Sequence, residues 1–150
     1  MSEKPGYRKL NHYKEKGFVF HGSIRQGLKV LLPQEPHDAG DDPWNKDEAV
    51  YATIEPALAI PFSLRKGYTG VLTVAMEPDR VMATFDAAFE SALLKNRGYV
   101  YVLDGSRFPE RKGVQCKAFE EVVPVDIVEV TVEDFTALGG LIVHVNQVSR

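Results

Sequence analysis

The chain has 150 residues, of which 44% are hydrophobic and 26% are charged, and its formal net charge is −3. This length and composition predict one globular domain around one hydrophobic core, and they exclude a disordered or fibrous protein. The acidic balance, with acids and bases interspersed, argues against a protein whose task is to wrap a nucleic-acid backbone.

Several further classes of protein are excluded by what the sequence lacks. Cys116 is the only cysteine, so no internal disulfide can form. No run approaches the roughly 20 apolar residues that cross a bilayer, and residues 1–17 hold no apolar stretch typical of a signal peptide. The histidines at positions 12, 21, 37 and 144 show no metal-ligand spacing with the cysteine or with one another. We therefore expect a cytoplasmic protein without a membrane segment or a metal site.

The N-terminal residues divide into a polar part and a short apolar run. Residues 1–16 are polar and basic, which predicts a solvated arm followed by a single domain over 17–150. The β-prone run that follows Gly17 stops at Gly22, which predicts a strand that ends in a tight turn. His21 is therefore expected at a strand end.

A helix and a long loop are predicted next. Apolar residues at helical spacing predict a short helix over 23–32, which Pro33 would end. Residues 34–49 are rich in Pro, Gly and Asp and show no periodicity, which predicts a long loop of the kind that often borders a site.

The middle of the chain alternates between strand-like and helix-like segments. A strand is predicted over 50–53, a helix over 55–66 and a buried strand over 70–76. Residues 84–97 place apolar side chains on one helical face and basic side chains in the last turn, which predicts a further helix.

The last third of the chain is predicted to be mostly sheet. A strand is expected over 99–103, at least two more over 114–130 with a break at Pro124, and a last one over 141–145. About six strands with two or three helices and no strict βαβ alternation predict the α+β class.

Three short motifs carry the functional prediction. They are FHGS at 20–23, VYAT at 50–53 and FEEVVPV at 119–125. In this order and at these intervals they resemble the His-Tyr-Glu branch of the ADP-ribosyltransferases, the branch of diphtheria toxin and poly-ADP-ribose polymerase, and especially its small prokaryotic domains. The resemblance covers roughly residues 18–130. It implies an ADP-ribosyltransferase-like fold, with two small packed antiparallel or mixed β-sheets flanked by two or three short helices, and NAD as co-substrate.

The resemblance implies a role for each residue of the first two motifs. His21 would hydrogen-bond the ribose, the backbone of Gly22 would meet the nicotinamide carboxamide, and Tyr51 would stack on the nicotinamide ring. Each residue type suits its role, because an imidazole bonds directionally, a glycine has no Cβ to block close approach, and a phenol offers a flat face to a cation. The plain alternatives are a structural histidine at a strand end and a half-buried strand tyrosine.

The third motif departs from the pattern of the family. Its relatives have an acid directly before the aromatic residue of this segment, where this chain has Ala118. A carboxylate is needed to stabilise the positive charge of an oxocarbenium-like ribose. Glu120 is the better substitute, because on a strand it would share a face with Ala118 whereas Glu121 would not. Two alternatives stay open: Glu120 and Glu121 are only a solvated charge pair at a strand edge, or another acid such as Glu90 or Asp104 takes the catalytic role.

Three more residues complete the predicted NAD site. Ser23 and Arg25 flank the turn after the first strand, and Arg25 would meet the pyrophosphate as a bidentate partner. Ser63 would contact the nicotinamide amide, as a serine does in the resembling enzymes. A surface arginine and a solvent-facing helix serine are the plain alternatives.

The predicted function is NAD-dependent ADP-ribosyl transfer to a protein, nucleic-acid or small-molecule acceptor, with release of nicotinamide. Catalysis would rest on Glu120, His21 and Tyr51. An antitoxin or immunity protein is a further partner that the resemblance suggests. One alternative is a catalytically weak or inactive NAD-binding module on the same fold, motivated by Ala118. A remote one is an RNA 2′-phosphotransferase-like activity, whose arginines have no evident place in this chain.

Overall fold

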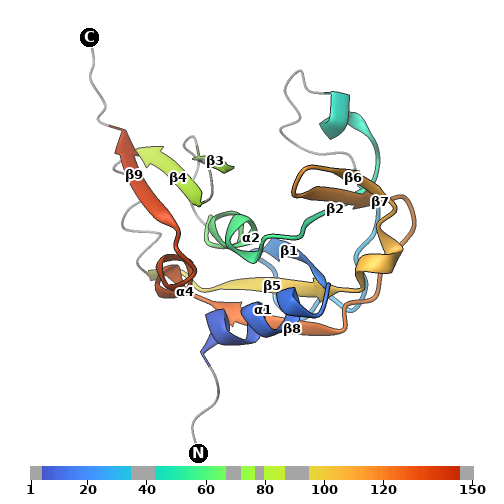
Figure 1. Cartoon of the computed structure of the whole chain (residues 1–150), viewed down its shortest axis with the longest axis horizontal. Helices are drawn as coiled ribbons and strands as arrows, with labels where there is room; N and C mark the ends of the chain where they lie inside the picture. Colours follow the sequence, from blue (N-terminus) through green and yellow to red (C-terminus); the bar gives the residue numbers. More distant parts are fainter. Residues whose placement is uncertain (1–4, 35–42, 67–71, 77–79, 87–94, 146–150) are drawn as a thin grey trace, which may run out of the picture.

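The computed structural model describes residues 5–34, 43–66, 72–76, 80–86 and 95–145. They form a six-stranded sheet, a separate three-stranded sheet and a few short helices (Figure 1). The arrangement confirms the predicted α+β class with two antiparallel or mixed sheets.

All neighbouring strands of the larger sheet are antiparallel, in the order β6-β7-β2-β1-β5-β8. The strands are β1 (Val19–Ser23), β2 (Val50–Thr53), β5 (Gly98–Leu103), β6 (Glu110–Lys112), β7 (Gln115–Ala118) and β8 (Asp126–Val130). The predicted strands at 17–22, 50–53, 99–103 and within 114–130 are therefore confirmed. None of the predicted strands corresponds to β6.

The larger sheet opens between β1 and β2. β1 pairs with β5 over its whole length, from Val19 opposite Leu103 to Ser23 opposite Tyr99. Its ladder with β2 consists of one pair, Phe20 opposite Thr53. In Figure 1, β2, β6 and β7 accordingly lie away from β1, β5 and β8. The edge of β1 beyond Phe20 thus has no strand partner on that side among the described residues.

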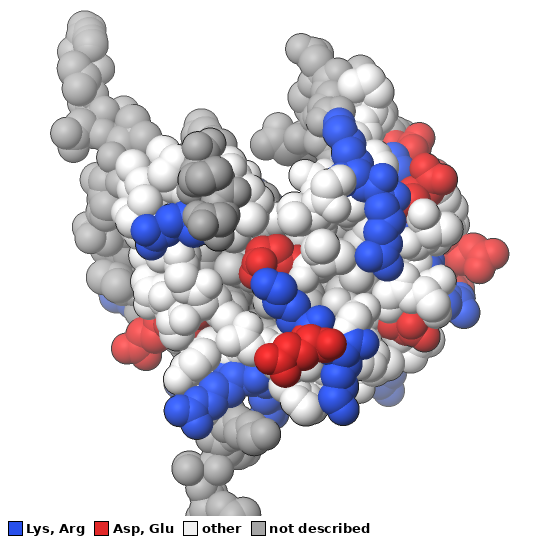
Figure 2. Space-filling model, in the orientation of Figure 1, with Lys and Arg blue, Asp and Glu red and all other residues white. Residues whose placement is uncertain are grey.

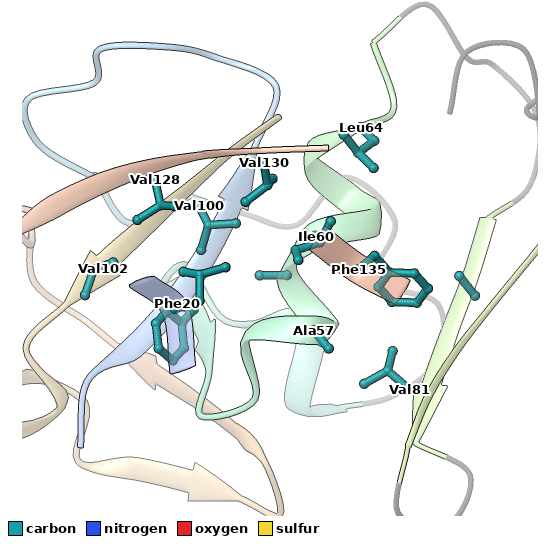
Figure 3. Close-up of a cluster of buried hydrophobic side chains, with 13 residues drawn as sticks. Phe20, Ala57, Ile60, Leu64, Val81, Val100, Val102, Val128, Val130 and Phe135 are labelled. Atoms are coloured by element: carbon teal, nitrogen blue, oxygen red, sulfur yellow. The ribbon is translucent and has the colours of Figure 1, made fainter. Parts of the chain in front are cut away.

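One face of the larger sheet is covered by helices. The helices are α1 (Gly6–Glu15), α2 (Pro56–Ser63) and α4 (Val132–Ala137). Phe20, Val100 and Val102 point to this face and form one buried cluster with Ile60 of α2, and Phe135 of α4 joins the cluster beyond Ile60 (Figure 3). Because strand side chains alternate between faces, this cluster forms one core and predicts a second on the opposite face.

The second core lies on the opposite face of the larger sheet. Val19, Tyr101 and Leu103 alternate with the residues of the first core, and all three are buried. The segment that crosses from β7 to β8 packs here through Val122, which pairs with Leu31 in an isolated bridge. Both faces of the central strands are therefore covered, so a ligand reaches these strands only where the sheet opens.

The three-stranded sheet contradicts one predicted helix. It has the order β3-β4-β9, with β3 (Leu72–Met76), β4 (Val81–Asp86) and β9 (Leu141–Val145), and β9 is parallel to β4. The helix predicted over 84–97 is wrong at its start, because Thr84–Asp86 belong to β4. Pairing with two strands outweighs the helical spacing there. Residues 87–94 of that prediction, and 70–71 of the predicted strand, lie outside the described residues.

The N-terminal arm is also corrected. Residues 6–15 form α1 rather than a solvated arm, and residues 1–4 lie outside the described part. Leu10 of α1 is fully buried in the first core, and the Tyr13 ring packs edge-on against Phe18. A single apolar stripe on an otherwise polar helix was enough to dock it.

The helix predicted over 23–32 is absent from the structure. The buried Tyr101 hydroxyl donates to the Arg25 carbonyl oxygen at 2.6 Å and accepts from the Leu28 N–H at 3.0 Å. A tertiary partner thus takes backbone groups that a helix would pair internally. The helix predicted over 55–66 is confirmed as α2, with Glu55 as its N-cap.

The predicted loop over 34–49 contains a 3₁₀ turn, η1 (Pro43–Lys46), and its ends are joined by a bridge between Gln34 and Ala49. A second 3₁₀ turn, η2 (Gly105–Arg107), follows β5. No helix among the described residues is long and apolar enough to cross a membrane.

Candidate functional site

His21 lies where β1 and β2 part. Its side chain points to the same face as Val19, beside its strand partner Tyr101. Its Nδ1 atom lies 2.7 Å from the carbonyl oxygen of Tyr51 on β2. At the start of the opening, the two strands are therefore joined by a hydrogen bond from the imidazole instead of one between backbone groups. A histidine with a purely structural role would also make this bond.

The bond to Tyr51 determines which nitrogen of His21 is left for a ligand. A carbonyl oxygen can only accept, so Nδ1 must carry the proton and Nε2 presents a lone pair when the ring is neutral. Burial lowers the pKa of His21 below its ordinary value, although the Tyr51 carbonyl opposes this shift. The His21 side chain is only partly exposed, and its Nε2 has no hydrogen-bond partner among the described residues. Nε2 is therefore left as an acceptor for a ligand.

Tyr51 borders the same opening from β2 but faces the other way. Its neighbours Val50 and Ala52 pack into the second core, so the Tyr51 ring lies on the face that α2 covers. The phenol donates to the Asp47 carbonyl oxygen at 2.8 Å and lies 3.3 Å from that of Trp44. Burial raises the pKa of Tyr51, so the phenol stays protonated and keeps these bonds. The ring is half-buried and is held by residues 43–47, which comprise η1 and Asp47 and are called the η1 segment.

Gly22 has a structural reason to be glycine. A Cβ at this position would lie 2.0 Å from the carbonyl oxygen of Ala59, so α2 crosses directly over it. Side-chain space at Gly22 is thus filled by the helix. Only its backbone groups, in the plane of the sheet, are in a position to meet a ligand.

Ser23 is the last residue of β1 and Arg25 follows it two residues later, and neither side chain is arranged to hold a phosphate. The Ser23 Oγ accepts from the Arg25 N–H at 3.0 Å. The Arg25 side chain is exposed, and no carboxylate of the described residues lies within ion-pair distance of its guanidinium. Arg25 is thus placed near the opening, with its charge directed at solvent.

Ser63 does not belong to the site. It is fully buried, its Oγ donates to the Ile60 carbonyl oxygen at 2.7 Å, and it packs against Gly98 of β5. Its hydroxyl is therefore out of reach of a ligand.

The third motif does not bring an acid to His21 or Tyr51. Ala118 ends β7 and is buried in the second core. Glu120 lies in a bend beyond the strand, so the expected alternation with Ala118 does not apply to it. Its side chain is 86% exposed, and its Oε1 lies 3.8 Å from the Arg107 Nη2. Asp104 instead caps η2 through Ser106, and Glu90 lies outside the described residues.

The structure adds Lys117, which is not among the residues predicted for the site. It is the strand partner of Tyr51 across β2 and β7, and only 3% of it is exposed. A lysine between Cys116 and Ala118, in a segment predicted to contain a strand, was the available signal. Buried lysines are rare unless they are paired.

The surface around the opening carries both charges. Figure 2 shows acidic and basic side chains intermingled on this face, with a notch between the part that holds η1, β2, β6 and β7 and the part that holds the three-stranded sheet. Two hollows, of about 540 and 250 Å³, lie elsewhere: one between 27–29 and 124–127, the other between α1 and the end of α4. No three His, Cys, Asp or Glu side chains of the described residues are grouped to hold a metal ion.

The site thus combines an imidazole acceptor, an unpaired strand edge and a half-buried phenol ring. The carboxylate of Asp47 lies beside the phenol but is paired with Lys117. Such a set can bind a ligand that has hydroxyl, amide and flat aromatic groups. No family model, curated protein or solved structure matches this chain.

Proposed function

We propose that the chain binds the nicotinamide end of NAD at the opening between β1 and β2, without efficient ADP-ribosyl transfer. The observation that carries this proposal is the bond from His21 Nδ1 to the Tyr51 carbonyl. It joins the two residues of the motifs at one place and leaves Nε2 as an acceptor for a ribose hydroxyl.

The other groups at the opening suit the rest of that ligand. The edge of β1 beyond Phe20 has no strand partner on the β2 side, so its amide and carbonyl groups can pair with a carboxamide. The Tyr51 ring offers a flat face to a pyridinium. Because the His21 and Tyr51 side chains leave opposite faces of the sheet, the ligand would enter edge-on between the diverging strands.

Weak turnover is proposed because the acid beside Tyr51, Asp47, is paired with Lys117, and the third motif brings no acid to His21 or Tyr51. Cleavage of the bond to nicotinamide leaves positive charge on the ribose, which a carboxylate must stabilise at close range. Ala118 cannot do this, and the Glu120 carboxylate is directed toward Arg107. Transfer through Glu120 is a second candidate function, since an exposed ion pair of this length is worth about 0–1 kcal/mol and would release Glu120 easily.

The test is calorimetric titration of the purified chain with NAD, beside chromatographic detection of released nicotinamide. His21→Ala removes the acceptor and should weaken binding about three- to tenfold. Tyr51→Leu removes the aromatic face and should weaken it to a similar extent. His12→Ala is the matched control, because His12 is exposed on α1. The urea midpoint of each variant is measured first, so that loss of binding is not loss of fold.

The outcomes separate the two functions. Binding that His21→Ala weakens and His12→Ala leaves unchanged, with no nicotinamide released, supports the proposal. Release that Glu120→Gln abolishes would establish transfer in its place. No binding by the wild type at about 1 mM NAD would refute both.

A further inference from the structure

The ammonium of Lys117 is held inside a ring of oxygens and aromatic side chains. Its Nζ donates to the Asp47 Oδ2 at 2.7 Å and to the Trp44 carbonyl oxygen at 2.9 Å. It also lies 3.9 Å from the centroid of the Trp44 ring, and 5.8 and 5.9 Å from those of Tyr51 and Phe119. Cations at such distances over aromatic faces are attracted to them.

The same groups hold Tyr51. The Trp44 carbonyl lies within reach of both the Lys117 ammonium and the Tyr51 phenol. Asp47 contributes its carboxylate to Lys117 and its carbonyl to Tyr51. The η1 segment is therefore fastened to β2 through Tyr51 and to β7 through Lys117, and the two attachments share their acceptors.

A buried charge is a costly way to fill this position. The strand neighbours of Lys117 are buried, and an apolar side chain would need no hydrogen bonds there. What the ammonium provides, and an apolar group does not, is a directional bond to two points of the η1 segment. The ammonium therefore determines how the η1 segment is oriented, and with it the Tyr51 ring that this segment holds.

We infer that Lys117 is a positioning residue, which docks the η1 segment through Asp47 and Trp44 and thereby orients the Tyr51 ring for its ligand. The inference rests on the proposed NAD site for the identity of that ligand. The docking itself is independent of any ligand.

Trp44 makes the docking measurable, because it is the only tryptophan of the chain. Lys117→Met keeps the length of the side chain and removes its charge. In the ligand-free protein, this variant should move the Trp44 emission to longer wavelength and increase its quenching by acrylamide. Because a small misplacement of a contact group can weaken an interaction strongly, the NAD affinity should fall about tenfold.

Two further variants guard against misfolding and against general charge effects. Asp47→Asn removes only the partner carboxylate, which is 51% exposed, and should shift the emission in the same direction by a smaller amount. Lys16→Met removes an exposed lysine at the end of α1 and should change neither readout. A merely structural role would alter the urea midpoint of Lys117→Met and leave its NAD affinity unchanged.

Each result decides one point. Wild-type emission in both Lys117→Met and Asp47→Asn overturns the inference, whatever the NAD result. An emission shift with unchanged NAD affinity overturns the positioning role. A wild type that binds no NAD overturns the proposed function, and the emission then tests the docking by itself. Shifted emission with weakened NAD binding, and neither change in Lys16→Met, supports the inference.

Discussion

Replacing Gly22 by alanine tests whether the glycine of the first motif serves the fold or the ligand. The added Cβ would lie 2.0 Å from the Ala59 carbonyl oxygen, whereas Cβ atoms essentially never approach another heavy atom closer than 3.0 Å. The axis of α2 would therefore have to move by about 1 Å. Overpacking of this kind costs about 1–3 kcal/mol. We expect the upper end, about 3 kcal/mol, because the obstructing atom belongs to the helix backbone.

Urea unfolding followed by circular dichroism measures this cost, and the corresponding drop in melting temperature is about 6–12 °C for a chain of this size. Ser23→Ala on the same strand is the control, and losing its one hydrogen bond should cost about 1 kcal/mol or less. Ala59→Gly should not rescue Gly22→Ala, since the clash is with a backbone oxygen. A Gly22→Ala variant with the stability of the wild type and impaired NAD binding would refute the reasoning, because the glycine would then serve the ligand alone.

Three other predictions concern protonation and capping. Since burial lowers the pKa of His21 from its ordinary value of 6.5, its contribution to stability should be complete above that pH and be lost as the pH falls through the folded-state pKa. His21→Gln should flatten that part of the plot of urea midpoint against pH, and parallel plots would contradict the assignment. Burial raises the pKa of the Cys116 thiol to about 11, so its reaction with a disulfide reagent at pH 8 should proceed only as fast as the chain unfolds; rapid labelling of the native protein would contradict this. The Asp134 carboxylate accepts from the Tyr7 and Thr131 N–H groups at 2.9 Å each and so joins the starts of α1 and α4. Asp134→Ala should lower the free energy of unfolding by about 1–3 kcal/mol in urea titration, and a change below about 0.5 kcal/mol would show that water replaces both bonds.

Local sequence was sufficient to predict an element wherever its own residues strongly favour one secondary structure. The strands β1, β2, β5, β7, β8 and β9 were predicted from apolar, β-prone runs, and α2 from its apolar spacing. Each of these runs strongly favours one secondary structure, and its neighbours in the fold stabilise that same structure. His21 at the end of a strand, Tyr51 on the next and Ala118 in place of an acid were likewise read directly from the motifs.

Tertiary contacts decided the rest, including most of the site. The turn at 23–32 is held by the Tyr101 hydroxyl, which lies 73 residues beyond Leu28 in the chain. Thr84–Asp86 join a strand because two partner strands are available to them. Ser63 is buried against Gly98 of β5. Glu120 lies beyond the end of β7, and its carboxylate turns toward Arg107.

The sequence by itself determined the α+β class, most strands and the places of His21 and Tyr51 on two of them. Only the tertiary structure decided that these two strands are neighbours that part after one pair, that Nε2 has no partner among the described residues, and that Lys117 holds the η1 segment against Tyr51. The physical reason is that strand preference depends on neighbours along the chain. The direction of a hydrogen bond and the burial of a charge depend on groups that only folding brings together.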